Sequence, residues 1–334
     1  MKKLYLISND KIWYSKNIYA SNNDLNNIIS CFNDHYIVNL ICRKSKKKFN
    51  YRLNQKINLK KIKDISENKI NVFMISISPY NFIIFLLLFL KDINFRGFVY
   101  LRSDGFMEYK IKYGLIGYYI YFFMFYFIKK KLKIISCSKN FTKVDTKKIV
   151  HPSELNHNWV IKRKIKKRLD SDLLYVGRFR KEKGTIFIST LFKKYFKKYK
   201  LKIVGTKKQM IDKKFYSKNI KFLGPVSDQK KLIKIYDSSK IFILPSYTEG
   251  FPKVILESLS RLRPAIIFKD IKYIVNGRKG IFVCDRNEKS LEYTIEHINK
   301  NYQYIQKSML KNYIYTKENF KKELLKIIKN DFQS

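Results

Sequence analysis

Short apolar segments alternate with helical segments along most of the chain, and this alternation constrains the fold more than any other feature. In the first half, strands are expected at residues 4–8, 36–42, 71–77, 98–102 and 133–137. In the second half, they are expected at residues 173–176, 201–204, 221–223, 241–244, 265–268 and 280–283. Buried strands separated by helices are typical of parallel sheets that helices cover on both faces. The sequence therefore predicts an α/β protein built from doubly wound, Rossmann-like parallel sheets.

The alternation breaks once, at a polar and basic stretch over residues 151–168 that suits a linker. A chain of 334 residues is long enough for two ordinary domains. We therefore expect an N-terminal domain over residues 1–165, a C-terminal domain over 166–310, and a helical segment over 311–334 that can cross back to the first domain. Ligands of doubly wound sheets bind beyond the carboxyl ends of the strands, so the chemistry is expected in a cleft that the two domains face.

The net charge of +45 comes mostly from lysine, since only 12 of the 71 Lys and Arg residues are Arg. Surfaces that bind nucleic acids favour Arg, whose planar guanidinium reads phosphates and base edges. The excess of Lys and the lack of a recognition motif argue against a nucleic-acid partner. Two interpretations stay open: a solvated lysine surface that needs no anionic partner, and lysines attracted to an anionic membrane surface.

An apolar run over residues 115–128 is followed directly by Lys129, Lys130 and Lys131. It is shorter than the roughly 20 residues that span a bilayer. The run is either a buried helix or a helix that lies against the lipid interface with its lysines on the headgroups. The first residues lack the apolar core of a signal peptide, and the four cysteines are too widely spaced for a disulfide framework or a zinc site. We expect a cytoplasmic protein, peripheral on the inner face of the cytoplasmic membrane under the second interpretation.

The first candidate site is the loop from Gly177 to Gly184, which follows an expected strand and opens a helix. Free backbone N–H groups, the positive end of the helix dipole and two long cations, Arg178 and Lys183, can converge there on a diphosphate. A solvated run of charges is the alternative interpretation in a chain this rich in lysine. The loop matches neither the P-loop nor the dinucleotide-binding pattern.

The second candidate site is the loop and helix that contain Glu249 and Glu257. The helix is expected over residues 252–261, with Pro252 at a favoured first position. The two carboxylates can face a ligand held at the start of this helix and accept hydrogen bonds from sugar hydroxyls. Either one alone could instead be a surface acid or an acid that favours the helix dipole.

Together these residues resemble the retaining GT-B glycosyltransferases of family 4. The resemblance rests on Gly177-Arg178 with Lys183-Gly184, and on Glu249 and Glu257 in a Glu-Gly-Phe-Pro context. Further segments that agree with the family's pattern lie at residues 222–226, 232–246 and 276–283. The resemblance extends from residue 173 to about residue 330 and implies the GT-B fold, in which two Rossmann-like domains face each other across a cleft.

The resemblance also implies roles for individual residues. Arg178 and Lys183 would hold the diphosphate of a nucleotide-sugar donor and, with Glu249, take part in catalysis. Glu249 would contact the transferred sugar, and Glu257 would accept hydrogen bonds from the ribose hydroxyls. The rest of the donor site is expected to consist of Gly205, Val226, Gly250, Phe251, Pro252 and Lys253. No cofactor is implied, because the nucleotide sugar is a substrate, and no metal ion is expected, because no Asp-x-Asp motif stands in a suitable loop.

The N-terminal domain departs from the family's pattern. Many members carry a His at a strand end that faces the sugar, and residues 100–105 contain none. Arg102 and Asp104 are the candidates there for side chains that face the cleft. In the second half, Arg263 stands before Pro264, where the family usually has Gly.

The sequence thus predicts a metal-independent hexosyltransferase that moves a sugar, with retention of configuration, to a glycan or lipid-linked acceptor. Bacterial cell-surface polysaccharide synthesis, of lipopolysaccharide or capsule, is the expected setting. The expected partners are the donor, the acceptor and an anionic membrane surface. The alternative is a catalytically silent GT-B scaffold or binding module at the membrane, against which the intact set of Arg178, Lys183, Glu249 and Glu257 argues.

Overall fold

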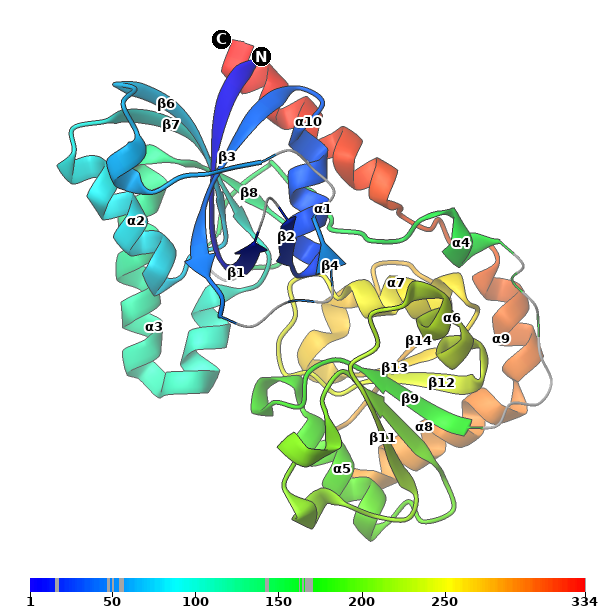
Figure 1. The fold of residues 1–334 in the computed structure, drawn as a ribbon. Coiled ribbons are helices and arrows are strands. Elements are labelled where there is room, and N and C mark those ends of the chain that lie inside the picture. The colour runs from blue at the N-terminus through cyan, green and yellow to red at the C-terminus, as the bar shows by residue number, and fades with distance from the viewer. Residues whose placement is uncertain are drawn as a thin grey trace. The chain divides into compact units, whose positions relative to one another are not determined.

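The structure, a computed structural model, separates the chain into two compact units (Figure 1). The first unit comprises Met1–Glu154 and Lys317–Ser334, and the second comprises Leu155–Thr316. The structure describes residues 1–15, 18–46, 49, 51–53, 57–141, 144–161, 163, 165 and 171–333. Each unit contains its own sheet, and each is described by itself below.

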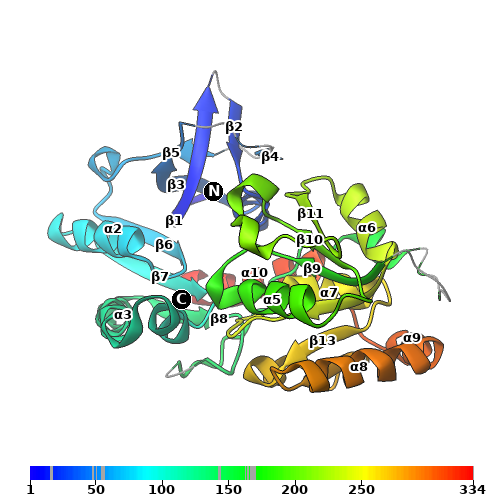
Figure 2. The ribbon, with the colours of Figure 1, turned by 90° about the horizontal axis from the view of Figure 1, so that it is seen from below.

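The sheet of the first unit has a parallel core in the order β5-β3-β1-β6-β7-β8. Its strands are β1 (Lys2–Ser15), β3 (Tyr36–Lys44), β5 (Asn58–Leu59), β6 (Lys69–Ile75), β7 (Asn94–Leu101) and β8 (Lys133–Ser136). The last three residues of β1 extend beyond this core and pair antiparallel with β2 (Ile18–Ser21), which pairs with β4 (Tyr51–Arg52) (Figure 2). The expected parallel strands are confirmed, and the antiparallel ribbon was not expected.

Most helices of the first unit begin at a residue whose side chain accepts a backbone N–H of the first turn. Asn22 does so for α1 (Asn23–Phe32), Ser78 for α2 (Pro79–Leu90) and Asp104 for α3 (Gly105–Lys131). Such caps satisfy donors that the helix itself leaves without partners. A short 3₁₀ turn, η1 (Ile62–Asp64), lies between β5 and β6.

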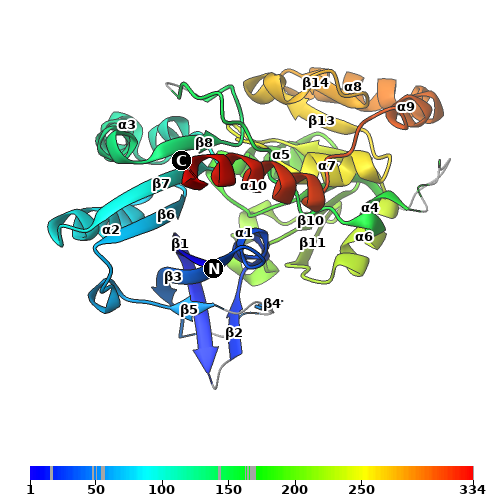
Figure 3. The same ribbon diagram turned by 90° about the horizontal axis from the view of Figure 1, so that it is seen from above.

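The last helix, α10 (Lys317–Gln333), belongs to the first unit although it follows the second unit in the chain. Its Phe332 ring contacts the rings of Tyr36 and Phe98, with centroids 6.3 and 5.7 Å apart, and Phe320 lies 6.0 Å from Tyr100. Figure 3 shows α10 beside α1. Buried aromatic rings therefore hold this helix on the sheet of the first unit.

The second unit has a fully parallel sheet in the order β11-β10-β9-β12-β13-β14. Its strands are β9 (Ser171–Val176), β10 (Leu201–Val204), β11 (Ile220–Gly224), β12 (Ser239–Leu244), β13 (Ala265–Phe268) and β14 (Ile281–Cys284). All six agree with expected apolar segments to within a few residues. The helices are α4 (His157–Val160), α5 (Thr185–Lys194), α6 (Gln229–Asp237), α7 (Lys253–Ser260), α8 (Glu288–Lys300) and α9 (Tyr302–Met309). Short 3₁₀ turns are η2 (Lys181–Lys183), η3 (Lys208–Met210), η4 (Lys213–Phe215) and η5 (Lys269–Ile274).

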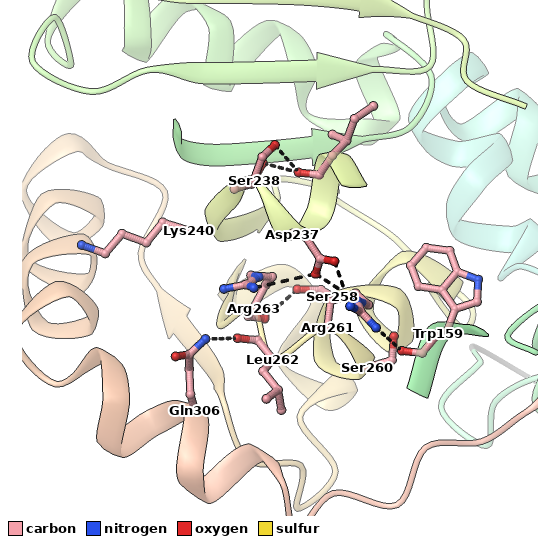
Figure 4. Close-up of polar contacts among 12 residues, drawn as sticks. Trp159, Asp237, Ser238, Lys240, Ser258, Ser260, Arg261, Leu262, Arg263 and Gln306 are labelled. Atoms are coloured by element: carbon pink, nitrogen blue, oxygen red, sulfur yellow. Dashed lines mark hydrogen bonds and ion pairs between the residues drawn. The ribbon is translucent and has the colours of Figure 1, made fainter. Parts of the chain in front are cut away.

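The boundary between the units falls between Glu154 and Leu155, rather than at the expected residue 165. The difference comes from α4, which lies in the stretch expected to be a linker. Trp159 on α4 is buried, and its ring lies 5.6 Å from that of Tyr236 in the second unit. Arg261 adds hydrogen bonds to the carbonyls of Trp159 and Ile161, at 3.0 and 2.9 Å (Figure 4). Residues 162, 164 and 166–170 of the expected linker lie outside the described residues.

Arg263, which stands where the family pattern usually has Gly, has a structural place in this same region (Figure 4). Its side chain is buried; it donates to the Tyr302 hydroxyl at 3.0 Å and lies 3.8 Å from Asp237 Oδ1. Asp237 also accepts two hydrogen bonds from Arg261, at 3.0 and 2.8 Å. The two arginines therefore share one carboxylate near the end of α7, which compensates part of the positive charge that their burial places there.

Candidate functional site

Two loops meet at the carboxyl edge of the sheet in the second unit. β9 and β12 are parallel neighbours, so the loop from Gly177 to Gly184 and the loop from Pro245 to Pro252 leave the sheet side by side. The Tyr247 amide donates to the Glu182 carbonyl at 3.0 Å, which ties the loops together directly. The two loops, which the sequence predicts as separate candidate sites, therefore lie against each other at one edge of the sheet.

Gly184 makes this close approach possible. It caps η2 and precedes α5 with a φ of +64°, and a β-carbon placed on it would lie 1.8 Å from the Pro245 carbonyl oxygen. Any larger residue would combine an unfavourable backbone conformation with a collision against the neighbouring loop. The position requires glycine for both reasons.

The structure brings two of the predicted catalytic residues into direct contact. Lys183 Nζ lies 2.7 Å from Glu249 Oε1, and the Ser246 hydroxyl donates to the same oxygen at 2.6 Å. The backbone of Glu249 is held in turn by the Tyr273 hydroxyl, which accepts from its amide at 3.2 Å and donates to its carbonyl. A charge-assisted hydrogen bond and a fixed backbone give this carboxylate a defined orientation.

Arg178 presents its guanidinium at the surface. Its backbone carbonyl accepts a 3.0 Å hydrogen bond from the buried Tyr175 hydroxyl, whereas among the described residues its guanidinium makes no hydrogen bond or ion pair. Burial, followed by the charge of Glu249, raises the pKa of Tyr175, so this phenol stays protonated and keeps donating. The loop backbone is thus fixed while the cation remains available to an anionic ligand.

Glu257 lies in the second turn of α7, and a tyrosine on α6 holds it. Tyr236 is fully buried, and its hydroxyl donates to Glu257 Oε2 at 2.8 Å. Burial first, and then the charge and hydrogen bond of Glu257, raise the pKa of Tyr236 well above its ordinary value. The phenol therefore remains a donor at neutral pH and orients the side chain of Glu257.

The other predicted donor-site residues also belong to the second unit. Gly205 follows β10 with a φ of +121°, and a β-carbon there would lie 2.2 Å from the Gly177 carbonyl. Phe251 is half-buried, with the Arg278 guanidinium 5.4 Å from its ring centre. The remaining members are the buried Gly250 and Pro252 and the half-buried Val226 and Lys253. Pro252 precedes α7 as its capping residue, so the helix begins one residue later than expected.

Arg286 supports the site and was not predicted from the sequence. Its guanidinium donates to the carbonyls of Pro245 and Ser246, at 2.9 and 3.2 Å, and pairs with Asp270 at 2.6 Å. It also lies 3.9 Å from the centre of the Tyr247 ring. A planar group with five donors can make all of these contacts at once, which a lysine cannot. The scarcity of Arg in this lysine-rich chain is the signal that could have identified it.

The two candidate residues of the first unit, Arg102 and Asp104, have different structural surroundings. Asp104 is buried and accepts the Met107 amide at 3.1 Å as the cap of α3. Arg102 follows β7 and donates to the Ser76 hydroxyl at 3.2 Å; its guanidinium lies 3.7 Å from Asp10 and 3.8 Å from Asp24. Arg102 therefore lies in a polar cluster at the carboxyl edge of its sheet, whereas Asp104 stabilises a helix end.

Residues 158–319, which make up most of the second unit, match the family model of glycosyl transferases group 1. This part of the chain is therefore similar to the group 1 glycosyltransferases. A sequence relative is an uncharacterized glycosyltransferase of Haemophilus influenzae, 27% identical over 180 residues that cover 47% of this chain and 50% of the relative. The chain spans about half the length of the curated relatives it matches.

Solved structures show the same fold over the whole chain. A sucrose-phosphate synthase from Thermosynechococcus elongatus superposes with a TM-score of 0.67 at 12% identity and covers 100% of both chains. HepE from Anabaena, in complex with UDP and glucose, gives 0.65 at 10% identity and covers 99% of this chain and 100% of its own. The expected GT-B fold of two Rossmann-like domains is confirmed. Among the described residues, no three His, Cys, Asp or Glu side chains converge as metal ligands would.

Proposed function

We propose that this protein is a retaining, family 4 hexosyltransferase that moves a sugar from a nucleoside-diphosphate donor to a glycan or lipid-linked acceptor. One observation carries the proposal. The Lys183–Glu249 ion pair joins the cationic loop and the acidic loop at the carboxyl edge of one parallel sheet, beside the exposed guanidinium of Arg178. This is the edge at which doubly wound sheets bind nucleotides.

The donor would be held by complementary charges. Arg178 and Lys183 bind the diphosphate, and the oriented Glu257 carboxylate accepts hydrogen bonds from the ribose hydroxyls. Lys183 has three donor hydrogens, so it can bridge Glu249 and a phosphate oxygen at the same time. The binding of UDP by the structurally similar HepE supports a nucleotide-sugar donor.

The same groups would promote the transfer. Breaking the bond between the anomeric carbon and the phosphate oxygen builds negative charge on the leaving diphosphate and positive charge on the sugar. Preorganised cations stabilise the first, and each such group is worth roughly 10²–10³ in rate. Glu249, held beside the sugar, stabilises the second. We propose that the acceptor hydroxyl attacks from the face that the diphosphate leaves and gives its proton to the departing diphosphate oxygen, which gives retention without a metal ion.

We further propose a cytoplasmic enzyme, peripheral on the inner face of the membrane, in the synthesis of a bacterial cell-surface polysaccharide such as lipopolysaccharide or capsule. The support for this setting is the apolar surface of the first unit, where α2 and α3 expose many large side chains. An enzyme with a lipid-linked acceptor must reach the membrane surface, and such a face gives it the means.

Calorimetric titration with a set of nucleoside diphosphates, together with a mass-spectrometric screen of nucleotide sugars, tests the proposal. We expect one diphosphate to bind and its sugar to be transferred or hydrolysed, and we expect Arg178→Ala and Lys183→Ala to weaken binding at least about tenfold. Arg43→Ala, which removes an exposed arginine of the first unit, is the matched control and should bind normally. Binding without transfer would support the silent scaffold, and no binding to any diphosphate would refute the donor site.

A further inference from the structure

Two neighbouring helices of the first unit expose an unusual amount of apolar surface. Of the 26 large apolar side chains that are exposed among the described residues, 14 lie on α2 and α3. They are Ile83, Leu86, Leu87, Phe89, Leu90, Tyr113, Leu115, Ile116, Tyr119, Ile120, Phe122, Phe123, Tyr126 and Phe127. Contiguous exposed apolar surface of this kind marks a site that binds a partner or a membrane.

α3 is a helical hairpin rather than one straight helix. Gly114 interrupts it with a φ of 68° and a ψ of −154°, and the two arms fold back on each other (Figure 2). Phe106 on the first arm contacts Phe125 on the second, with ring centroids 5.2 Å apart, and a β-carbon on Gly105 would collide with the Tyr121 ring. By length and composition the 27 residues of α3 could cross a bilayer, but the bend divides them into arms too short to do so.

The exposed residues form one stripe on each helix. On α2 they lie at 83, 86, 87, 89 and 90, and on the second arm of α3 at 115, 116, 119, 120, 122, 123, 126 and 127, which together form one broad helical face on each helix. The helices lie side by side, because the Phe82 ring contacts those of Phe123 and Phe127 at 5.8 and 6.4 Å. The opposite face of the second arm is buried in the first unit through Met124, Phe125 and Ile128. The helices can therefore lie on an apolar medium but cannot be surrounded by one.

The charges beside this surface are mostly positive. Lys110 precedes the apolar run and Lys129–Lys131 follow it directly, whereas Lys112 is paired with Glu108 and Asp92 follows the end of α2. Lys129 and Lys130 are exposed next to the aromatic surface, with the Lys130 ammonium 4.3 Å from the Tyr126 ring centre. Tyr and Phe beside Lys are the residues that anchor helices at a membrane interface.

We propose that the surface formed by α2 and the second arm of α3, which we call the α2–α3 face, docks in the plane of an anionic lipid bilayer. The inference rests on the membrane association proposed above and names its surface, its orientation and the lipid charge it requires. A second copy of this chain is a poorer occupant, because its own lysines would be brought against the same lysines. An anionic bilayer offers apolar chains for the stripes and negative headgroups for the lysines at both ends.

Flotation of the whole protein with vesicles tests the proposal. We expect binding to phosphatidylcholine vesicles that contain about one-third phosphatidylglycerol, and at least about tenfold weaker binding to phosphatidylcholine alone. Leu90→Glu/Ile116→Glu replaces side chains that are 78% and 73% exposed and should reduce binding at least about tenfold. Met210→Glu/Tyr304→Glu changes side chains of the second unit that are 76% and 77% exposed, and should leave binding unchanged.

The role of the lysines has its own matched pair. Lys129→Gln/Lys130→Gln/Lys131→Gln should reduce binding to the anionic vesicles at least about tenfold. Lys230→Gln/Lys231→Gln/Lys234→Gln removes the same charge from exposed positions of α6 and should have little effect. Equal losses in the two triple variants would mean that net charge alone attracts the chain, and would overturn the assignment to this face.

Two further results would overturn the docking mode. Retention in vesicles after alkaline carbonate would indicate a spanning segment rather than a face that lies on the surface. A concentration-dependent dimer that Leu90→Glu/Ile116→Glu dissociates, with no flotation of the parent protein, would identify a second copy as the occupant. Calorimetric binding of nucleoside diphosphate should be the same in all of these variants, so a failure of the α2–α3 face is distinguishable from a failure of the donor site.

Discussion

Lys183 and Glu249 are separated by 66 residues in the chain, yet the Lys183 ammonium lies 2.7 Å from a Glu249 carboxylate oxygen. The contact exists because β9 and β12 are neighbours, and each residue lies on the loop that follows the carboxyl end of one of these strands. It also means that Glu249 and the diphosphate would compete for Lys183, because the carboxylate that orients Lys183 is an anion beside the proposed position of the diphosphate. Charge at this distance affects ligand affinity by amounts that can be measured.

This competition predicts opposite effects of the two residues on binding. Glu249→Gln removes the negative charge, so affinity for free nucleoside diphosphate should rise about three- to tenfold while sugar transfer falls at least about 100-fold. Lys183→Met should lower both. Calorimetry and a transfer assay provide the two measurements, with Glu292→Gln, a half-buried acid on α8 that pairs with Lys198, as control. A Glu249→Gln variant that loses diphosphate affinity as strongly as Lys183→Met would show that Glu249 chiefly positions the lysine.

Tyr236→Phe tests whether the orientation of Glu257 matters. Phenylalanine keeps the ring that contacts Trp159 and Phe242 but loses the donor to the carboxylate. A hydrogen bond to a charged group contributes about 1.5–3 kcal/mol, so affinity for the nucleoside diphosphate should fall at least about tenfold. The corresponding deoxyribose diphosphate should lose much less affinity in the variant, because Glu257 would have one hydroxyl fewer to bind. Equal losses for the two ligands would place the role of Tyr236 outside ribose recognition.

The same substitution predicts a change in alkaline stability. The pKa of Tyr236 is raised in the folded state, so its contribution to stability is complete below the unfolded value near 10 and is lost as pH rises towards the folded value. Above pH 10, the free energy of unfolding should therefore fall about 1.4 kcal/mol less steeply per pH unit in Tyr236→Phe than in the parent. Trp159 fluorescence in a Trp13→Phe background can follow the second unit, with the exposed Tyr304→Phe as control. Parallel slopes would contradict the assignment.

Gly184→Ala should destabilise the second unit far more than a substitution at another glycine with a left-handed backbone. Gly184 and Gly277 have φ values of +64° and +72°, but a β-carbon on Gly277 meets nothing within 4 Å. We expect a cost of about 1–2 kcal/mol for Gly277→Ala, from backbone conformation alone. Gly184→Ala should cost at least about 3 kcal/mol, because the collision with Pro245 is added. Urea unfolding measures both, and similar costs would mean that the two loops separate easily.

Two substitutions of Asp104 can decide whether its role is to cap α3 or to bind the acceptor. As the cap of α3 it should be replaceable by Asn, which accepts the same backbone hydrogen bond, whereas Asp104→Ala should cost about 1 kcal/mol of stability. If capping is its whole role, transfer activity in Asp104→Asn should match that of the parent at every acceptor concentration. A raised KM for the acceptor in Asp104→Asn, with unchanged thermal stability, would instead assign the carboxylate to the acceptor.

The parallel strands and both site loops were predictable because each is marked by a pattern within its own short stretch of sequence. A buried parallel strand is an apolar run, and a loop such as Gly177–Gly184 combines glycine with cations directly after one. Contacts between distant segments were not predictable. In the sequence, nothing distinguishes Tyr236, Ser246 and Arg286 from ordinary core or surface residues. Only the folded chain places Tyr236 against Glu257, Ser246 against Glu249, and Arg286 against the Pro245 carbonyl.

One wrong prediction and one undecided prediction about individual elements have physical causes. β1 was expected to end at Ser8 because Asn9, Asp10 and Lys11 are polar, but the strand continues past a register shift there into the antiparallel ribbon with β2. For the apolar run after Gly114, the sequence allows both a buried helix and a helix at the lipid interface. Its composition suits both environments, and only the packing of α3 against its own first arm and α2 shows that much of it is exposed.

The position of α10 has a consequence for how the chain matures during translation. The helix that covers Tyr36, Phe98 and Tyr100 is synthesised only after every residue of the second unit. Throughout that interval the nascent first unit carries an uncovered aromatic surface, open to chaperones and to mispairing with other nascent chains. Polypeptides stalled or truncated anywhere before Lys317 should accordingly be recognised as incomplete through their first unit, even when the second unit has already folded.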